Sequence, residues 1–186
     1  MIYECMETLP SSFSNGLFTL RPIALDDIEN IRIWRNDQKE VLRQETHLTQ
    51  EDQLNYWKNS ILPTFTEKEP DQLLFGLIDN HVNTLVAYGG LVHMNWGNRY
   101  AESSFLSTTD RTRDLRAYTT LFVNHLELLM MIASSLNLSW IYSETYSFRK
   151  HHIRILEDFG YQQYGHLNNS SDTKNASILH RFYLDK

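Results

Sequence analysis

The sequence predicts an α/β (α+β) fold, in which helices flank one central mixed, mostly antiparallel sheet. Residues 115–136 place apolar side chains at helical spacing and contain no glycine or proline, so we expect a long helix there. Residues 100–107 form a strand in which Glu102, Ser104 and Leu106 lie on one face. The elements follow the order β-α-α-β-β-β-α-β-α-β-β, which one sheet with helices on its faces accommodates.

The first elements are a strand and two helices. Residues 17–23 read as a strand, and Pro22 near its end indicates an edge position because proline donates no ladder hydrogen bond. Residues 26–36 read as a helix with two aspartates at its positive N-terminal end. Thr49 begins the second helix, because Thr49 and Asp52 have the spacing of a capping box.

Strands dominate the rest of the chain. Gly160 is predicted to end the last helix, since glycine adopts the left-handed conformation that closes helices. The predicted order is a polar loop at 63–70, strands at 73–79, 85–94 and 100–107, the helix at 115–136, a strand at 138–146, a helix at 151–159, and strands at 161–167 and 176–184 joined by a polar loop at 168–175.

Composition excludes several classes of protein. The 186 residues suit one domain, which we place at 17–186 after a leader at 1–16. A net charge of −6 disfavours nucleic acid and anionic membranes as partners. A single cysteine permits no internal disulfide, and neither a signal peptide nor a membrane-spanning run is found. We therefore expect a cytoplasmic protein.

Four stretches in a fixed order carry a resemblance to a known family. They are LRP at 20–22 leading to WRND at 34–37, GGL at 89–91, NRYAESSFL at 98–106, and HIRILEDFGY at 152–161 followed by GHL at 165–167. In this order they resemble the GCN5-related N-acetyltransferases (GNAT), in particular the branch that acetylates protein N-termini or nucleotide-linked amino sugars.

The resemblance implies a function. It implies transfer of an acetyl group from acetyl-CoA to a primary amine, with no metal, and a small molecule such as a nucleotide-linked amino sugar as the acceptor. A peptide N-terminus is an alternative acceptor. A non-catalytic acyl-CoA-binding or scaffold protein is an alternative of another class. A homodimer is left open.

The expected cofactor loop departs from the family pattern. The family carries a glycine-rich loop before its long helix, whereas residues 110–117 contain no glycine. Three arginines stand at this helix N-terminus, where positive side chains are unfavourable without an anion; the alternative is a solvated loop in which Arg113 pairs with Asp110 or Asp114. The predicted cofactor-binding residues are Phe105, Leu106, Ser107, Arg111, Arg113, Asp114, Leu115, Arg116, Ala117, Arg149 and His151.

The resemblance also suggests catalytic residues. Glu102 occupies the place of a family general base that accepts the proton of the attacking amine; the alternative is an ion pair with Arg99 or Arg149. Leu156 stands where the family has a tyrosine acid, so we consider Tyr146 as its substitute. Backbone N–H groups around residues 105–107 are expected to stabilise the oxyanion.

The sequence evidence for an acceptor site and for a metal site is weaker. Trp34, Arg35 and Trp57 are the predicted substrate-binding residues, although tryptophans are more often part of a core. His151 and His152 are adjacent and would point about 100° apart on a helix, so they do not predict a metal site.

Overall fold

The computed structural model describes residues 1–42, 44–167 and 176–184. Within them one sheet has the strand order β1-β2-β3-β4-β5-β6-β8-β7, and every neighbouring pair is antiparallel except β5–β6. The predicted fold class is confirmed, while the loop predicted at 168–175 lies outside the described residues. The strands are β1 Phe13–Ser14, β2 Phe18–Pro22, β3 Leu73–Asp79, β4 Thr84–Asn95, β5 Tyr100–Ser107, β6 Trp140–Tyr146, β7 Gln162–Leu167 and β8 Ser177–Tyr183.

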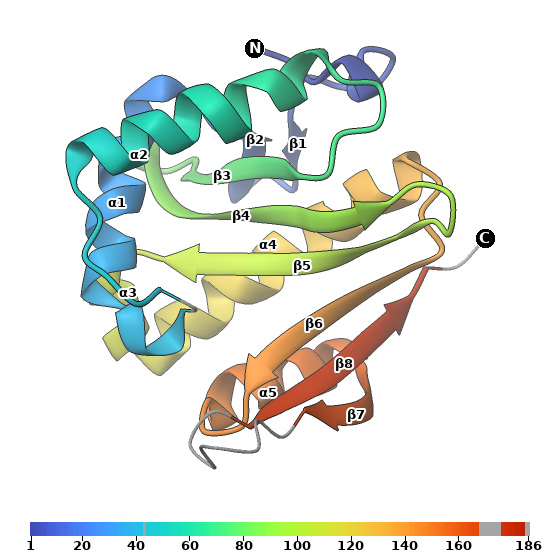
Figure 1. Ribbon diagram of the computed structural model, residues 1–186. Coiled ribbons are helices and arrows are strands. Elements are labelled where there is room, and N and C mark those ends of the chain that lie inside the picture. The colour runs from blue at the N-terminus through green and yellow to red at the C-terminus, as the bar shows by residue number, and fades with distance from the viewer. Residues whose placement is uncertain (43, 168–175, 185–186) are drawn as a thin grey trace.

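Helices cover the sheet (Figure 1). The long helix α4 crosses one face and contacts β1, β2, β4 and β5, and its apolar side chains form much of the core. Within the described ranges no helix is long and apolar enough to cross a bilayer. The helices are α1 Ile28–Asp37, α2 Gln50–Tyr56, α3 Thr109–Arg113, α4 Leu115–Ser135 and α5 Lys150–Phe159, with a π-helical turn at Trp57–Ile61 and 3₁₀ turns at Glu4–Met6, Leu25–Asp27, Lys39–Val41 and Leu62–Thr66.

Two details of the N-terminal half differ from the prediction. β2 is not the edge strand, because the two-residue β1 pairs with Thr19 and Leu20. No residue of β1 lies opposite Pro22. The polar loop expected at 63–70 begins as a 3₁₀ turn whose Phe65 is buried. The leader packs on this turn: the Tyr3 ring stacks on Phe65 with centroids 4.2 Å apart.

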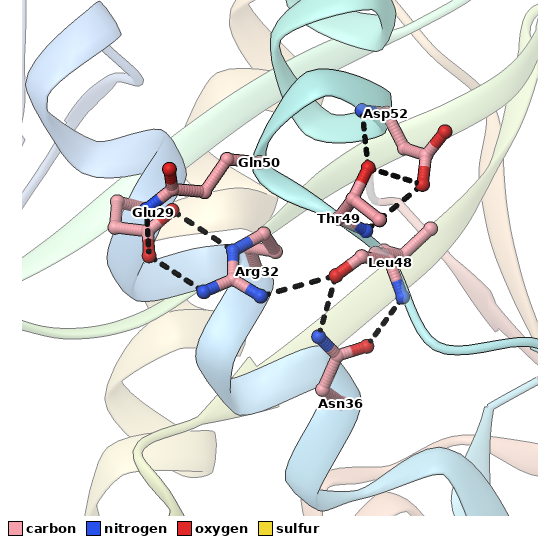
Figure 2. Close-up of polar contacts among 7 residues, drawn as sticks. All are labelled: Glu29, Arg32, Asn36, Leu48, Thr49, Gln50 and Asp52. Atoms are coloured by element: carbon pink, nitrogen blue, oxygen red, sulfur yellow. Dashed lines mark hydrogen bonds and ion pairs between the residues drawn. The ribbon is translucent and has the colours of Figure 1, made fainter.

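Polar contacts fix the connection from α1 to α2 (Figure 2). The Asn36 carboxamide donates to Leu48 O (2.9 Å) and accepts from Leu48 N (2.8 Å), so a single side chain satisfies both backbone groups. Arg32 also donates to Leu48 O (3.0 Å). The predicted capping box is present, since Asp52 N donates to Thr49 Oγ1 and Thr49 N donates to Asp52 Oδ2. These bonds hold the end of α1, where Arg35 lies, against the start of α2.

Two glycines allow β3, β4 and β5 to approach closely. A Cβ on Gly89 would lie 2.0 Å from Ser104 O, and one on Gly90 would lie 2.0 Å from Leu73 O. Neither contact is tolerable for a side chain, so this strand crossing requires glycine at both positions.

Candidate active site

A cleft opens where β5 and β6 separate. The two parallel strands pair only from Tyr100 to Glu102 on β5 and from Trp140 to Tyr142 on β6. They then diverge, as Figure 1 shows, toward the end of the sheet at which α1 lies. A cavity of about 290 Å³ occupies the opening, and both strands line it. Its polar lining residues are Arg35, His93, Glu102, Ser103, Ser104, Ser143, Glu144, Thr145, Tyr146, Arg149, His152 and Ser177.

The backbone of β5 presents hydrogen-bonding groups to this cleft. Thr108 N donates to Val86 O (3.0 Å) at the end of the β4–β5 ladder. Hydrogen-bonded and non-bonded pairs alternate in antiparallel ladders, so residues 103, 105 and 107 direct their N–H and C=O groups toward β6. Gln38 Nε2 donates to Ser107 O (2.9 Å) on that side. The N–H of Phe105 therefore faces the opening left by β6.

A buried histidine holds the peptide group that carries this N–H. His125 on α4 is fully buried, and its Nε2 lies 3.1 Å from Ser104 O. A carbonyl only accepts, so Nε2 carries the proton; burial lowers the pKa of His125 to about 4, which keeps the ring neutral. Because the Ser104 C=O and the Phe105 N–H belong to one peptide plane, this bond fixes the direction of the N–H.

Glu102 lies in the cleft beside a histidine and a tyrosine. The Glu102 side chain is 15% exposed, and its Oε2 is 3.8 Å from His93 Nε2. Burial, followed by the neighbouring Glu102 carboxylate to which it is hydrogen-bonded, raises the pKa of Tyr142. His93 reaches this place because β4 bulges between Val92 and Asn95, where His93 has a φ of 50°. Positive φ in a residue other than glycine is uncommon and is often found at functional sites.

A second polar cluster forms the opposite side of the cleft. Arg149 Nη2 donates to the Tyr118 hydroxyl (3.0 Å), and that hydroxyl lies 2.7 Å from His152 Nδ1. Arg149 Nη2 also lies 3.4 Å from His152 Nδ1, and a guanidinium only donates, so Nδ1 accepts and His152 carries its proton on Nε2. Burial and the Arg149 charge lower the pKa of His152, so this imidazole is neutral. Tyr146 also lines the cleft and stacks on Phe148.

The mouth of the cleft lies between the starts of α4 and α5. A cavity of about 440 Å³ there is lined by Thr112, Leu115, Arg149, Lys150 and His151 among others. His151 Nε2 lies 3.0 Å from Thr119 Oγ1 on α4. Arg149, Lys150 and His151 thus face a cavity large enough for a phosphate-bearing group, and Glu40 is the one carboxylate among its described lining residues.

The N-terminus of α4 is capped from within the chain. The predicted loop at 110–117 is the short helix α3 followed by Asp114, whose Oδ1 accepts from Arg116 N (2.9 Å) and Ala117 N (3.2 Å). These are the donors that a pyrophosphate at this helix end would use. The arginine side chains at 111, 113 and 116, like Asp114 and Ala117, line none of the cavities described above. The mouth therefore offers free donors to an anionic group, whereas two N–H groups at the α4 N-terminus already bind Asp114.

A smaller cavity adjoins the cleft under α1 and α2. It measures about 160 Å³ and is lined largely by apolar side chains from α1, α2, β3, β4 and β5, with Arg35 also lining the cleft. Phe105 and Leu106 of the predicted set reach it. Trp34 and Trp57 are 8% and 4% exposed, belong to the core and line no described cavity.

Sequence reasoning missed several residues of this site. His93, Tyr118, His152 and Glu144 line the cleft or its mouth, but none was singled out as a site residue. His93 depends on a bulge that has no local sequence signal. Tyr118 and His152 are 34 residues apart on two helices. Helical periodicity predicts that each side chain faces inward, but it does not predict that the two meet.

Solved structures with the same architecture are N-acetyltransferases. The spermidine N-acetyltransferase from Vibrio cholerae, in complex with CoA and spermine, matches with a TM-score of 0.75 and 18% identity over 91% of this chain and 97% of that chain. A GNAT-family acetyltransferase from Bacillus anthracis matches with a TM-score of 0.70 and 14% identity over 94% and 99%. At these identities the likeness establishes the fold.

The family follows from the sequence itself. The model of the acetyltransferase (GNAT) domain matches residues 20–180. The chain belongs to the GNAT acetyltransferase family, which confirms the resemblance at the level of the superfamily, while the branch that its motifs suggested stays a prediction. No curated protein sequence matches the chain.

Proposed function

We propose that this chain transfers an acetyl group from acetyl-CoA to the primary amine of a small molecule. The observation that carries the proposal is the cleft between β5 and β6, which combines a glutamate, an inward-facing backbone N–H and a basic mouth in one opening. The solved spermidine N-acetyltransferase of this fold was crystallised with CoA and a polyamine, which supports a small amine as the acceptor.

Glu102 is the proposed general base. It lies in the half-buried centre of the cleft next to His93. An ammonium group must lose a proton before its nitrogen can attack, and a carboxylate within reach accepts that proton directly or through a water molecule. The Phe105 N–H, held by the Ser104–His125 contact, stabilises the oxyanion that develops on the acyl oxygen.

The mouth of the cleft is the proposed place for the phosphates of the cosubstrate. Acetyl-CoA supplies an activated thioester. The Arg149, Lys150 and His151 side chains line the mouth and offer N–H donors to anionic oxygens. Tyr146 is kept as the proposed donor of a proton to the leaving thiolate, and His152 Nε2 in the same cleft is a second donor. A thiol pKa near 8.5 makes either donation helpful and not essential.

Two measurements on the purified protein test this function. Acetyl-CoA at many times its Kd stabilises a folded protein by a few kcal/mol, so a clear rise in Tm is expected, and no rise with acetate. Thiol release is then followed with a panel of amines. No Tm shift at millimolar acetyl-CoA, or no amine-dependent thiol release, contradicts the proposal.

A non-catalytic acyl-CoA-binding protein is the second candidate. The Asp114 cap on α4 and the buried Leu156 at the place of the family tyrosine favour it. This candidate predicts a Tm shift with acetyl-CoA and no thiol release with any amine.

A further inference from the structure

The small cavity beside the cleft carries a single charge. Of the described residues that line it, Arg35 alone is charged, and the other polar side chains are those of Gln53, Tyr56, Gln72, Tyr88 and Ser104. No carboxylate lines this cavity within the described part of the chain. The second ammonium group of a polyamine would meet the Arg35 charge here with no carboxylate to offset it, which disfavours a polycation in this cavity.

Arg35 keeps most of its donors available. Its Nη1 donates to the Tyr88 hydroxyl (3.0 Å), and among the described residues this is its one hydrogen-bond or ion-pair partner. A guanidinium has five N–H donors in a planar fork that matches a carboxylate. The side chain is half-buried and lines both the small cavity and the cleft, so its remaining donors face enclosed space.

A second polar group in the same cavity lacks a partner. Gln53 is 4% exposed and lines the cavity. Among the described residues none hydrogen-bonds to its carboxamide, although its backbone continues the helical ladder from Thr49. The carboxamide atoms themselves are not fully buried, so they can donate to, or accept from, a polar group that enters the cavity.

The neighbouring cleft contains the carboxylates that the small cavity lacks. Glu102 and Glu144 line the cleft together with Arg149, and Arg35 lies at its border with the small cavity. An acceptor that lies across this border meets carboxylates at its amine end and a guanidinium at its other end. This arrangement complements a molecule with one ammonium and one anionic group.

We infer that the acceptor is a compact amino carboxylate, whose amine lies near Glu102 and whose carboxylate is bound by Arg35. The inference rests on the proposed function, because it names the substrate class of that same site. A cavity of about 160 Å³ admits a carboxylate with a short side chain and excludes a nucleotide. Neither a polyamine nor the amino sugar of a nucleotide sugar places a carboxylate there.

Matched pairs of acceptors test the inference. Free amino acids, β-alanine and 4-aminobutyrate are each compared with the corresponding carboxamide, and spermidine is included as the polycation. A charge-assisted bond to a carboxylate is worth about 1.5–3 kcal/mol, so kcat/KM for an acid should exceed that for its amide by roughly 10- to 100-fold. Equal rates for acids and amides, or a preference for spermidine, overturn the inference.

Two variants test whether Arg35 causes the preference for acids over amides. Arg35→Met keeps the length of the side chain and removes the charge, so the ratio of kcat/KM between acid and amide should fall close to one. Arg154→Met is the matched control, because Arg154 is exposed on α5 and pairs with Asp158 at the surface. An unchanged ratio in Arg35→Met, with circular dichroism showing a folded protein, also overturns the inference.

A binding measurement tests the acceptor class independently of the proposed acetyl transfer. The same pairs are titrated into the CoA-saturated protein and followed by NMR. If thiol release fails with every amine, the transfer reaction is contradicted, yet selective binding of acids that Arg35→Met abolishes still supports the inference. Failure of every acid to bind the wild type contradicts it, whatever the turnover.

Discussion

The Asp114 carboxylate at the start of α4 affects whether an anion can bind at that helix end. Asp114 takes the two N–H groups at positions 116 and 117 and places a negative charge at the helix end. That charge stabilises the helix dipole and opposes a phosphate brought to the same place. The predicted role of the arginines at 111, 113 and 116 in phosphate binding stays a prediction, and the cavity at the mouth favours Arg149 and Lys150 instead.

Replacing Asp114 by Asn should strengthen CoA binding. Asn caps helices as well as Asp does, so the stability cost should be limited to the lost charge–dipole attraction of about 0.3–1 kcal/mol. Removing a charge–charge repulsion of up to about 1 kcal/mol should lower the Kd for CoA by up to about 5-fold. Calorimetric titration of CoA measures this change. Asp110→Asn is the control, because Asp110 lies one turn earlier on α3 and its loss changes the net charge equally. A Kd that rises in Asp114→Asn would show that Asp114 assists the cosubstrate.

Replacing Glu102 by Gln separates catalysis from structure. If Glu102 is the base, turnover should fall by roughly 10²-fold or more, and raising the pH should restore part of the loss because more of the amine is already neutral. CoA affinity and Tm should change little, since Gln retains the shape. A pH–rate profile from 6 to 9 measures the effect. A variant that keeps its rate but loses stability would show that the contacts with His93 and Tyr142 are structural.

At the scale of elements, the pairing of β4 with β3 and β5 depends on glycine. Gly89→Ala would bring a methyl group to 2.0 Å from Ser104 O, so the strands must move apart. We expect a loss of several kcal/mol in the free energy of unfolding, measured by urea denaturation, as for other sterically disallowed substitutions. Gly97→Ala is the control: the nearest heavy atom to its added Cβ is 3.8 Å away, and the change should cost less than about 1 kcal/mol. Similar losses for both variants would contradict the steric explanation.

Elements with a regular pattern could be predicted from the sequence. The strands at 73–79 and 100–107 have the predicted bounds, and the long helix ends one residue before its prediction. Gly160 closes α5 with a φ of 111°, as its residue type indicated. Periodicity reports which face of an element is buried, and that information is local.

Site geometry could be predicted only in part, because it depends on how elements meet. The separation of β5 from β6 after three pairs has no signal within either strand. Trp34 and Trp57 are of a residue type that is common in binding sites, but their positions around their helical turns direct both side chains into the core. Arg35 is one residue further along α1, and that rotation by about 100° directs it to the cavities instead.

At the scale of the whole molecule, the pH dependence of folding stability includes a contribution from histidines that are buried in the neutral form. His125 and His152 both have pKa values lowered by burial, to about 4 for His125. In the unfolded chain the same groups titrate near 6.5. Between these values the unfolded state binds more protons than the folded state, so acidification favours unfolding. Well above pH 6.5 both states hold neutral rings and stability does not depend on these groups; as the pH falls below 6.5 the unfolded state gains protons first, and for His125 the resulting loss of stability grows until about pH 4.

His125→Gln should therefore flatten the loss of stability in acid. The shift in pKa from 6.5 to about 4 corresponds to about 3 kcal/mol of unfolding free energy that the wild type loses over that range through His125. Gln offers an N–H to Ser104 O and does not titrate, so the variant should lack that part of the pH dependence even if its stability at pH 7.5 is lower. Urea denaturation at pH 7.5, 6.5, 5.5 and 4.5 gives both curves. His81→Gln is the control, because His81 is exposed in the turn before β4 and its replacement should leave the slope unchanged. A wild-type curve that parallels that of His125→Gln would show that His125 is protonated within the fold, and the neutral donor assigned to Ser104 O would then be wrong.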